Sequence, residues 1–170
     1  MSGSKGFFYL LEAFKIACKD KDFFKKAHLI ATGQNDIKKF KAKASKLHIE
    51  DKIISFEKRN DLEKFYKSAD CFAYPSLYDS AGFVIEEALA CSLPVIASKF
   101  AGYSKLVKKA KTRVVIDPTD INKFSEVLLD FFYKSKEELN KLPCNASNFM
   151  IKLNSIKDED IFDRFRQNTL

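Results

Sequence analysis

The 170-residue chain is long enough for one domain with a substantial core, because 46% of its residues are hydrophobic and 17 are Phe. No apolar run reaches membrane-spanning length and no N-terminal signal sequence is present, so we expect a cytoplasmic protein. The formal charge of +7 favours anionic partners such as a phosphorylated glycan or the acidic face of the inner membrane, although a solvated lysine surface is the simpler explanation. No nucleic-acid-binding motif is present, which argues against a nucleic-acid partner.

The N-terminal half alternates between helical and strand patterns. Apolar residues at positions 7, 10, 11, 14 and 17 predict a helix with one buried face. A buried strand is predicted at 27–33, ended by Gly33, and a lysine-rich helix follows to about Leu47. A strand at 52–56 and a helix at 62–69 come next. We interpret His28, within the first of these strands, as a structural residue rather than a catalyst.

The second half continues the alternation. A strand at 71–74 is stopped by Pro75, and a helix at about 82–91, capped by Ser80 or Asp79, leads to a strand at 95–97. A loop at 99–103, a helix to about Lys109, a strand at 113–116 and a helix from Ile121 follow. Short helices are predicted at 136–139 and 157–167, the latter within a weakly patterned C-terminal extension at 143–170. The pattern predicts a single α/β domain over residues 1–170.

The four cysteines lack metal-ligand spacing, and we interpret most of them as buried reduced thiols. Zinc is therefore not expected.

The start of the helix at 82–91 is the candidate functional feature. Gly82 has no Cβ, so the first helical turn can lie directly against a ligand. The N–H groups and the positive dipole end of that turn favour an anion, most naturally a phosphate. Asp79 and Glu87 flank the turn. An anion site between two carboxylates suits a ligand with a diphosphate in the middle and hydroxyls at both ends, such as a nucleotide-sugar.

The same stretch resembles the donor-site motif of retaining GT-B glycosyltransferases. The shared features are two acids eight positions apart, Gly82-Phe83-Val84 between them, and Leu93-Pro94-Val95-Ile96-Ala97-Ser98 after them. Ala81-Gly82 and the later Ala101-Gly102-Tyr103 are closest to the lipopolysaccharide core glucosyltransferase group. The resemblance covers about Lys5 to Pro118. The first acid of the family is normally Glu, and here it is Asp79.

The resemblance implies a role for each site residue. Lys5, in a Lys-Gly pair with Gly6, would reach the donor phosphates. Glu87 would accept hydrogen bonds from the ribose, and Asp79 would hold a hydroxyl of the donor sugar beside the small Ala81. The predicted catalytic residues are Asp79, Glu87 and Lys5, and the predicted substrate-binding residues are Gly6, Gly33, Arg59, Ala81, Gly82, Phe83 and Val84.

Four of these residues lie outside the central motif, namely Lys5, Gly6, Gly33 and Arg59. Gly33 resembles the family's turn under the nucleotide. Arg59 would lie near the base, where a guanidinium can stack on uracil. A surface Arg paired with Asp61 is the alternative, and the two interpretations are nearly balanced.

The expected chemistry needs no metal or other cofactor. The helix start at Gly82-Phe83-Val84 and the cation of Lys5 together could stabilise negative charge that develops on a leaving diphosphate. The absence of an Asp-x-Asp motif agrees with this expectation.

The resemblance also predicts what the chain lacks. The expected fold is the C-terminal half of a GT-B enzyme, a Rossmann-like doubly wound parallel sheet lacking its first strand, with a gap between the strands at 27–32 and 70–74. The acceptor-binding N-terminal domain would be missing. The leading hypothesis is the UDP-glucose-binding half of a hexosyltransferase of lipopolysaccharide or lipooligosaccharide core assembly, acting on a glycan or glycolipid acceptor. A non-catalytic remnant or interaction module, or a sugar-nucleotide epimerase, are the alternatives.

Overall fold

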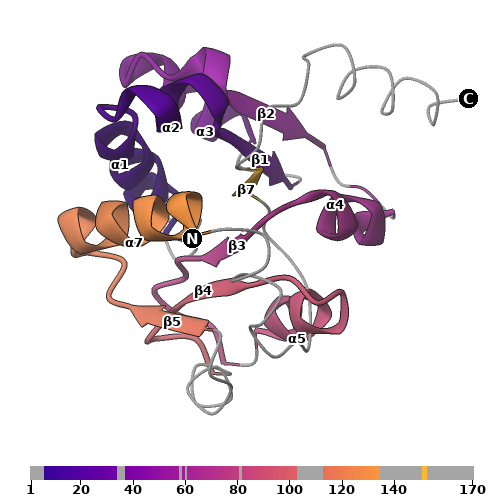
Figure 1. Cartoon of the computed structure of the whole chain (residues 1–170). Helices are drawn as coiled ribbons and strands as arrows, with labels where there is room; N and C mark the ends of the chain where they lie inside the picture. The colour runs from indigo at the N-terminus through magenta and orange to yellow at the C-terminus, as the bar shows by residue number, and fades with distance from the viewer. Residues whose placement is uncertain are drawn as a thin grey trace, which may run out of the picture.

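The computed structural model describes residues 6–33, 37–57, 59, 61–80, 82–102, 113–134 and 151–152 (Figure 1). Helices and strands alternate along most of this length. In chain order they are α1 (Phe7–Ala17), α2 (Lys21–Lys26), β1 (His28–Thr32), α3 (Ile37–Lys46), a 3-10 helix (Glu50–Lys52), β2 (Ile53–Phe56), α4 (Leu62–Ser68), β3 (Phe72–Tyr74), α5 (Phe83–Ala90), β4 (Val95–Ser98), β5 (Arg113–Ile116), α7 (Ile121–Tyr133) and β7 (Ile151–Lys152).

The described strands form two three-stranded sheets, in the orders β2-β1-β7 and β3-β4-β5. The pairs β1/β2, β3/β4 and β4/β5 are all parallel. Parallel neighbours require crossover connections, and helices supply most of them here. The prediction of an α/β fold with a parallel sheet is therefore confirmed.

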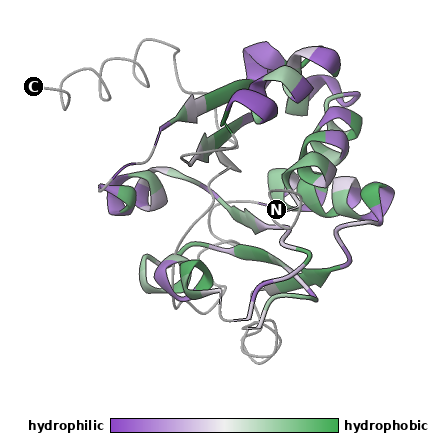
Figure 2. Cartoon of the chain, turned by 180° about the vertical axis from the view of Figure 1, so that it is seen from behind, coloured by the Kyte–Doolittle hydropathy of each residue, from purple (hydrophilic) through white to green (hydrophobic). Residues whose placement is uncertain are grey.

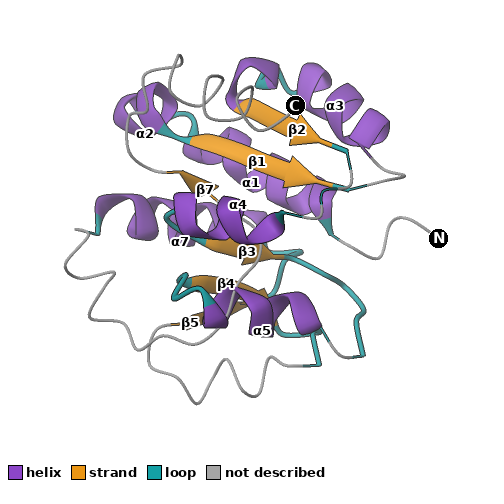
Figure 3. Cartoon of the chain, turned by 90° about the vertical axis from the view of Figure 1, so that its right-hand side faces the viewer, coloured by secondary structure: helices purple, strands orange, loops and turns teal. Residues whose placement is uncertain are grey.

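The two sheets share the same two hydrophobic cores. In β1, Leu29 and Ala31 belong to one core, whereas Ile30 belongs to the other. In β3, Ala73 joins the first core, and Tyr74 joins the second. This alternation follows from the two-residue period of a strand. Helices α1 and α7 cover one face and α4 and α5 the other (Figures 1 and 3), and the strands between them are largely hydrophobic (Figure 2).

Strand β7 corrects one expectation. It pairs antiparallel with β1, with His28 opposite Lys152 and Leu29 opposite Ile151. Figures 1 and 3 both place β7 between β1 and β3, where the sequence predicted a gap. Part of the β1 edge is therefore hydrogen-bonded to the C-terminal extension, whose weak sequence pattern predicted no strand. The two-residue β7 is too short to show any period in the sequence.

Helix α2 was not predicted. Its six residues begin after Asp20, whose carboxylate accepts the Phe23 N–H at 2.8 Å, and Phe23 is fully buried. A helix of this length shows less than two turns of apolar period, so capping and burial of one ring define it. The helices predicted at about 103–109, 136–139 and 157–167 lie outside the described residues.

The described cysteines agree only in part with their interpretation. Cys18, Cys71 and Cys91 are free thiols, as expected, but of these three only Cys71 is buried, and the other two are half-buried. Burial raises the pKa of the Cys18 thiol to about 11 and raises that of Cys71, so both stay protonated at neutral pH. Cys144 lies outside the described residues. His28 is half-buried within β1.

Candidate functional site

The candidate site is built on the loop that follows β3. This strand ends at Tyr74, and the loop from Pro75 to Ser80 leads to α5. Figure 3 shows the arrowheads of β1 and β2 and the loop after β3 on the same, right-hand side of the molecule. In open α/β sheets this edge, beyond the carboxyl ends of the strands, is where ligands bind.

Gly6 brings the backbone immediately before α1 against this region. It has a φ of 67° and is buried, and a Cβ added to it would lie 1.8 Å from the carbonyl oxygen of Pro75. The backbone before α1 therefore packs directly on the backbone after β3, at a distance that only glycine allows. Lys5 itself lies outside the described residues. Gly6, the residue after Lys5, nevertheless places the N-terminal end of α1 against the Pro75 loop.

Asp79 is held in the loop by several contacts of its side chain and backbone. Its Oδ1 accepts the Gly82 N–H at 3.0 Å, and its Oδ2 accepts the Tyr74 hydroxyl. Its carbonyl oxygen accepts the Gly102 N–H at 2.9 Å, and Asp79 forms a parallel bridge with Ala101. The carboxylate is thus fixed on the loop, and the loop is fixed on the segment after β4.

The start of α5 differs from the predicted cap. The N-cap residue is Gly82, with a φ of 70°, rather than Ser80 or Asp79. Asp79 instead closes the turn before the helix by accepting the Gly82 N–H. Because a left-handed φ suits glycine, the chain can turn into the helix within one residue. Phe83 (64% exposed) and the half-buried Val84 form the first turn, at the positive end of the helix dipole. Ala81 lies outside the described residues.

Glu87 lies on the second turn of α5. Its Oε2 accepts the hydroxyl of Tyr66 in α4 at 3.2 Å. The adjacent Glu86 is also exposed. Successive helical residues point about 100° apart, so the two carboxylates face different surroundings. The contact with Tyr66 gives Glu87 a defined position beside α4.

Gly33 and Arg59 follow the carboxyl ends of β1 and β2. The Gly33 N–H donates to the Phe56 carbonyl at 3.2 Å, and a Cβ added at Gly33 would meet no atom within 4 Å. Arg59 forms a two-fold contact with Asp61, with Nε and Nη2 each 2.8 Å from a carboxylate oxygen. This hydrogen bonding raises the pKa of Arg59 and lowers that of Asp61. The pairing with Asp61 is the alternative that the sequence offered, and the role of Arg59 beside a base stays a prediction.

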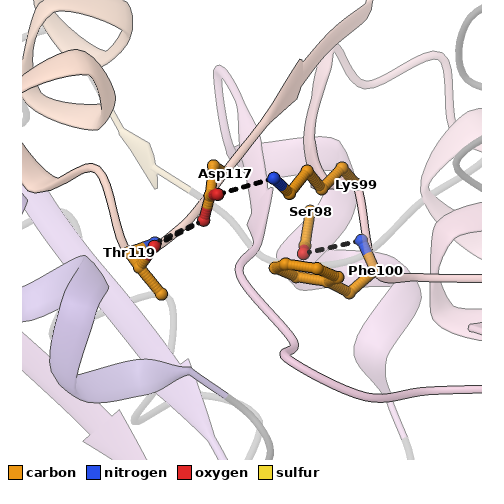
Figure 4. A network of polar contacts seen from close by, with 5 residues as sticks. All are labelled: Ser98, Lys99, Phe100, Asp117 and Thr119. Atoms are coloured by element: carbon orange, nitrogen blue, oxygen red, sulfur yellow. Dashed lines mark hydrogen bonds and ion pairs between the residues drawn. The ribbon is translucent and has the colours of Figure 1, made fainter.

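A polar network supports the segment after β4 (Figure 4). Lys99 forms an ion pair with Asp117 at 2.7 Å, and Asp117 also accepts from the backbone and hydroxyl of Thr119. The Ser98 hydroxyl accepts the Phe100 N–H at 3.1 Å. The hydrogen bond from Lys99, followed by those from Thr119, lowers the pKa of Asp117 to about 2. The network ties the ends of β4 and β5 together next to Ala101, the bridge partner of Asp79.

The sequence interpretation missed the two tyrosines. Tyr66 and Tyr74 donate to the two acids of the motif, and both rings are buried. A Tyr in a helix and another at the end of an apolar strand are ordinary core residues, so no sequence pattern distinguished them. The contact of Gly6 with the Pro75 carbonyl was also missed, because the two residues are far apart in the sequence.

The comparison with protein families identifies the chain. Residues 1–149 match the model of the family described as "Glycosyl transferases group 1". The chain belongs to this glycosyltransferase family. Its strands and helices form part of a GT-B fold, as the solved structures below indicate.

Among curated group 1 relatives, the chain is similar to the lipopolysaccharide glucosyltransferase WaaG of Escherichia coli K12. They are 33% identical over 101 residues, which is 59% of this chain and 27% of WaaG. The D-inositol 3-phosphate glycosyltransferase of Paenarthrobacter aurescens is 29% identical over 84 residues, 48% of this chain and 21% of the relative. The chain thus spans about a quarter of the length of these relatives.

Solved glycosyltransferase structures have the same fold. The crystal structure of WaaG, a glycosyltransferase involved in lipopolysaccharide biosynthesis, superimposes with a TM-score of 0.73 at 29% identity, over 81% of this chain and 36% of WaaG. Anabaena HepE, solved in complex with UDP and glucose, superimposes with a TM-score of 0.70 at 19% identity, over 85% of this chain and 40% of HepE.

Among the described residues, no group of three or more His, Cys, Asp or Glu side chains is arranged to hold a metal ion. In the same part of the chain, no helix is both long enough and apolar enough to span a membrane.

Proposed function

We propose that this chain is the donor-binding half of a retaining hexosyltransferase of lipopolysaccharide or lipooligosaccharide core assembly. The proposed donor is UDP-glucose, and the proposed acceptor is a core glycan or glycolipid held by residues beyond the region spanned here. The family match and the similarity to WaaG support the reaction class. HepE, which has the same fold, was solved with UDP and glucose, and this supports the donor.

One observation carries the proposal. The two acids of the motif flank a glycine-started helix, and the backbone of Gly6 packs on Pro75 in the loop that leads to this helix. A nucleotide-sugar laid along the start of α5 would have its diphosphate at the helix N-terminus, its ribose toward Glu87 and its sugar toward Asp79. Lys5, next to Gly6 in the sequence, would contribute its ammonium group to the phosphates.

In the proposed mechanism the domain stabilises the leaving group. Transfer breaks the bond between the anomeric carbon of the sugar and the diphosphate, so negative charge grows on the UDP. The α5 N-terminus and the Lys5 ammonium would stabilise this charge by fixed dipoles and a cation. No metal ion is required in this scheme.

Calorimetric titration of the full chain with UDP and UDP-glucose tests the proposal. We expect both to bind in buffer containing EDTA, and GDP-mannose to bind much more weakly. Glu87→Gln should weaken both uridine ligands by about 1.5–3 kcal/mol, the typical contribution of a hydrogen bond to a charged group. Glu86→Gln is the matched control, because it makes the same change one residue earlier on α5. Equal behaviour of the two variants would refute the placement of the ribose.

A non-catalytic interaction module is the second candidate. It is favoured by one observation, namely that both oxygens of Asp79 already accept hydrogen bonds within the chain. Absence of any nucleotide binding by the folded chain would support this candidate over the first.

A further inference from the structure

Two buried tyrosines lie directly behind the two acids of the motif. The Tyr66 hydroxyl in α4 donates to Oε2 of Glu87 at 3.2 Å, and the Tyr74 hydroxyl at the end of β3 donates to Oδ2 of Asp79. Tyr66 is 6% exposed and Tyr74 is 3% exposed. Each acid therefore has its own tyrosine donor, supplied by a different element.

Both rings are fixed by the same core. Tyr66 and Tyr74 belong to the hydrophobic cluster that also contains Phe65, Phe72 and Ile85. A ring packed at core density cannot change its rotamer without displacing its neighbours, so the position of each hydroxyl is determined by the fold. Glu87, by contrast, is exposed on a helix, where its long side chain has several accessible rotamers, and the hydrogen bond from Tyr66 favours one of them.

Tyr66 acts as a neutral donor. Burial raises the pKa of the Tyr66 hydroxyl, and the nearby Glu87 charge adds to this effect. The phenol therefore stays protonated and donates to the ionised carboxylate, which accepts only. A carboxylate has about four acceptor positions, so one bond from a tyrosine leaves room for ligand hydroxyls.

We propose that Tyr66 and Tyr74 are positioning residues, each of which fixes one acid of the motif in its ligand-binding orientation. This rests on the proposed function: Tyr66 acts through Glu87 on the affinity for the nucleotide, and Tyr74 acts through Asp79 on the additional affinity contributed by the sugar. The pair thus divides donor recognition between α4, which orders the acid on α5, and β3, which orders the acid on the loop.

A purely structural role makes a different prediction. If each carboxylate serves only as the hydrogen-bond acceptor of a buried tyrosine hydroxyl, Tyr→Phe removes that hydroxyl and changes only the stability of the fold. Ligand affinity would then stay the same, or would change equally for both tyrosines and both ligands. The difference between UDP and UDP-glucose separates the two roles.

The experiment titrates UDP and UDP-glucose by calorimetry against Tyr66→Phe and Tyr74→Phe, which both keep the ring. Tyr66→Phe should weaken both ligands by roughly 3- to 10-fold, the range for loss of one hydrogen bond. Tyr74→Phe should leave UDP within about twofold and weaken UDP-glucose by roughly 3- to 10-fold. Tyr133→Phe is the matched control, since it removes a tyrosine hydroxyl that donates to Asp20 at 2.9 Å on another part of the surface.

A double-mutant cycle tests whether Tyr66 acts through Glu87. In a Glu87→Ala background, Tyr66→Phe should have no further effect on UDP affinity, because the acceptor is already gone. Thermal melts of each variant verify folding.

Unchanged affinities in the tyrosine variants, or additive losses in the cycle, would overturn the assignment while leaving the proposed function intact. A folded wild-type chain that binds neither ligand would refute the proposed function and this assignment with it.

Discussion

Replacement of Gly6 by Ala tests the contact on which the candidate site depends. Gly6 has a φ of 67°, and the added Cβ would lie 1.8 Å from the Pro75 carbonyl oxygen and 2.7 Å from its carbonyl carbon. Both neighbours are backbone atoms, so no flexible side chain can move aside. Either the backbone at Gly6 or the loop after β3 must shift by more than 1 Å, roughly the difference between 1.8 Å and ordinary van der Waals contact.

The magnitude follows from two terms. A left-handed backbone costs a residue with a Cβ about 1–2 kcal/mol. Overpacking that forces a backbone shift costs about 1–3 kcal/mol. We expect Gly6→Ala to lower the free energy of unfolding by about 2–5 kcal/mol. We also expect it to weaken UDP-glucose binding, because the backbone at Gly6, next in sequence to the predicted phosphate-binding Lys5, would be displaced.

Two other glycines provide the controls. Gly82 also has a positive φ, of 70°, but its added Cβ would make ordinary contacts of 3.5 Å or more, so Gly82→Ala should lose only the backbone term of about 1–2 kcal/mol. Gly33→Ala meets nothing within 4 Å and should change stability by less than about 1 kcal/mol.

The free energies of unfolding come from urea titrations followed by circular dichroism. The expected order of destabilisation is Gly6→Ala, then Gly82→Ala, then Gly33→Ala. A Gly6→Ala variant within 0.5 kcal/mol of wild type, roughly the scatter of a neutral surface substitution, would refute the direct backbone contact.

Three further outcomes are expected. Asp79→Asn keeps an acceptor for the Gly82 N–H, so it should reduce only the additional affinity that UDP-glucose has over UDP. If the Asp79 side chain is too short to reach the sugar fully, Asp79→Glu should increase that additional affinity. Equal losses for both ligands in Asp79→Asn would contradict this placement of the sugar. Because the pKa of Asp117 is lowered to about 2, its ionised form stabilises the fold above about pH 4, and this contribution should disappear as the pH falls toward 2. In urea titrations between pH 2 and 6, the free energy of unfolding should fall less steeply with decreasing pH in Asp117→Asn than in the wild type. An equal pH dependence in the two proteins would refute the role of the Lys99–Asp117 pair. Ile151→Pro removes a backbone donor from β7 and restricts its backbone, so it should expose the β1 edge and increase self-association in sedimentation experiments. A monomer as stable as wild type would show that β7 does not protect that edge.

Local patterns in the sequence determined most elements. The apolar spacing at 7–17 gave α1, and short apolar runs ended by Gly33 and Pro75 gave β1 and β3. The central motif placed Gly82 at the start of a helix between two acids, and the structure has it there. These features depend on neighbours within about two helical turns, where backbone preferences and side-chain period act directly.

The tertiary structure alone decided which distant residues meet. Gly6 packs on Pro75, and Tyr66 in α4 contacts Glu87 in α5. Strand β7 pairs with β1, which lies more than a hundred residues earlier in the chain. Such contacts depend on how the helices and strands pack together. Two residues far apart in the chain produce no periodic pattern, so a single sequence cannot indicate that they meet. The composition of the motif indicated its chemistry, whereas the orientation of its two acids came from rings buried in a core that forms only when the sheet and its helices assemble.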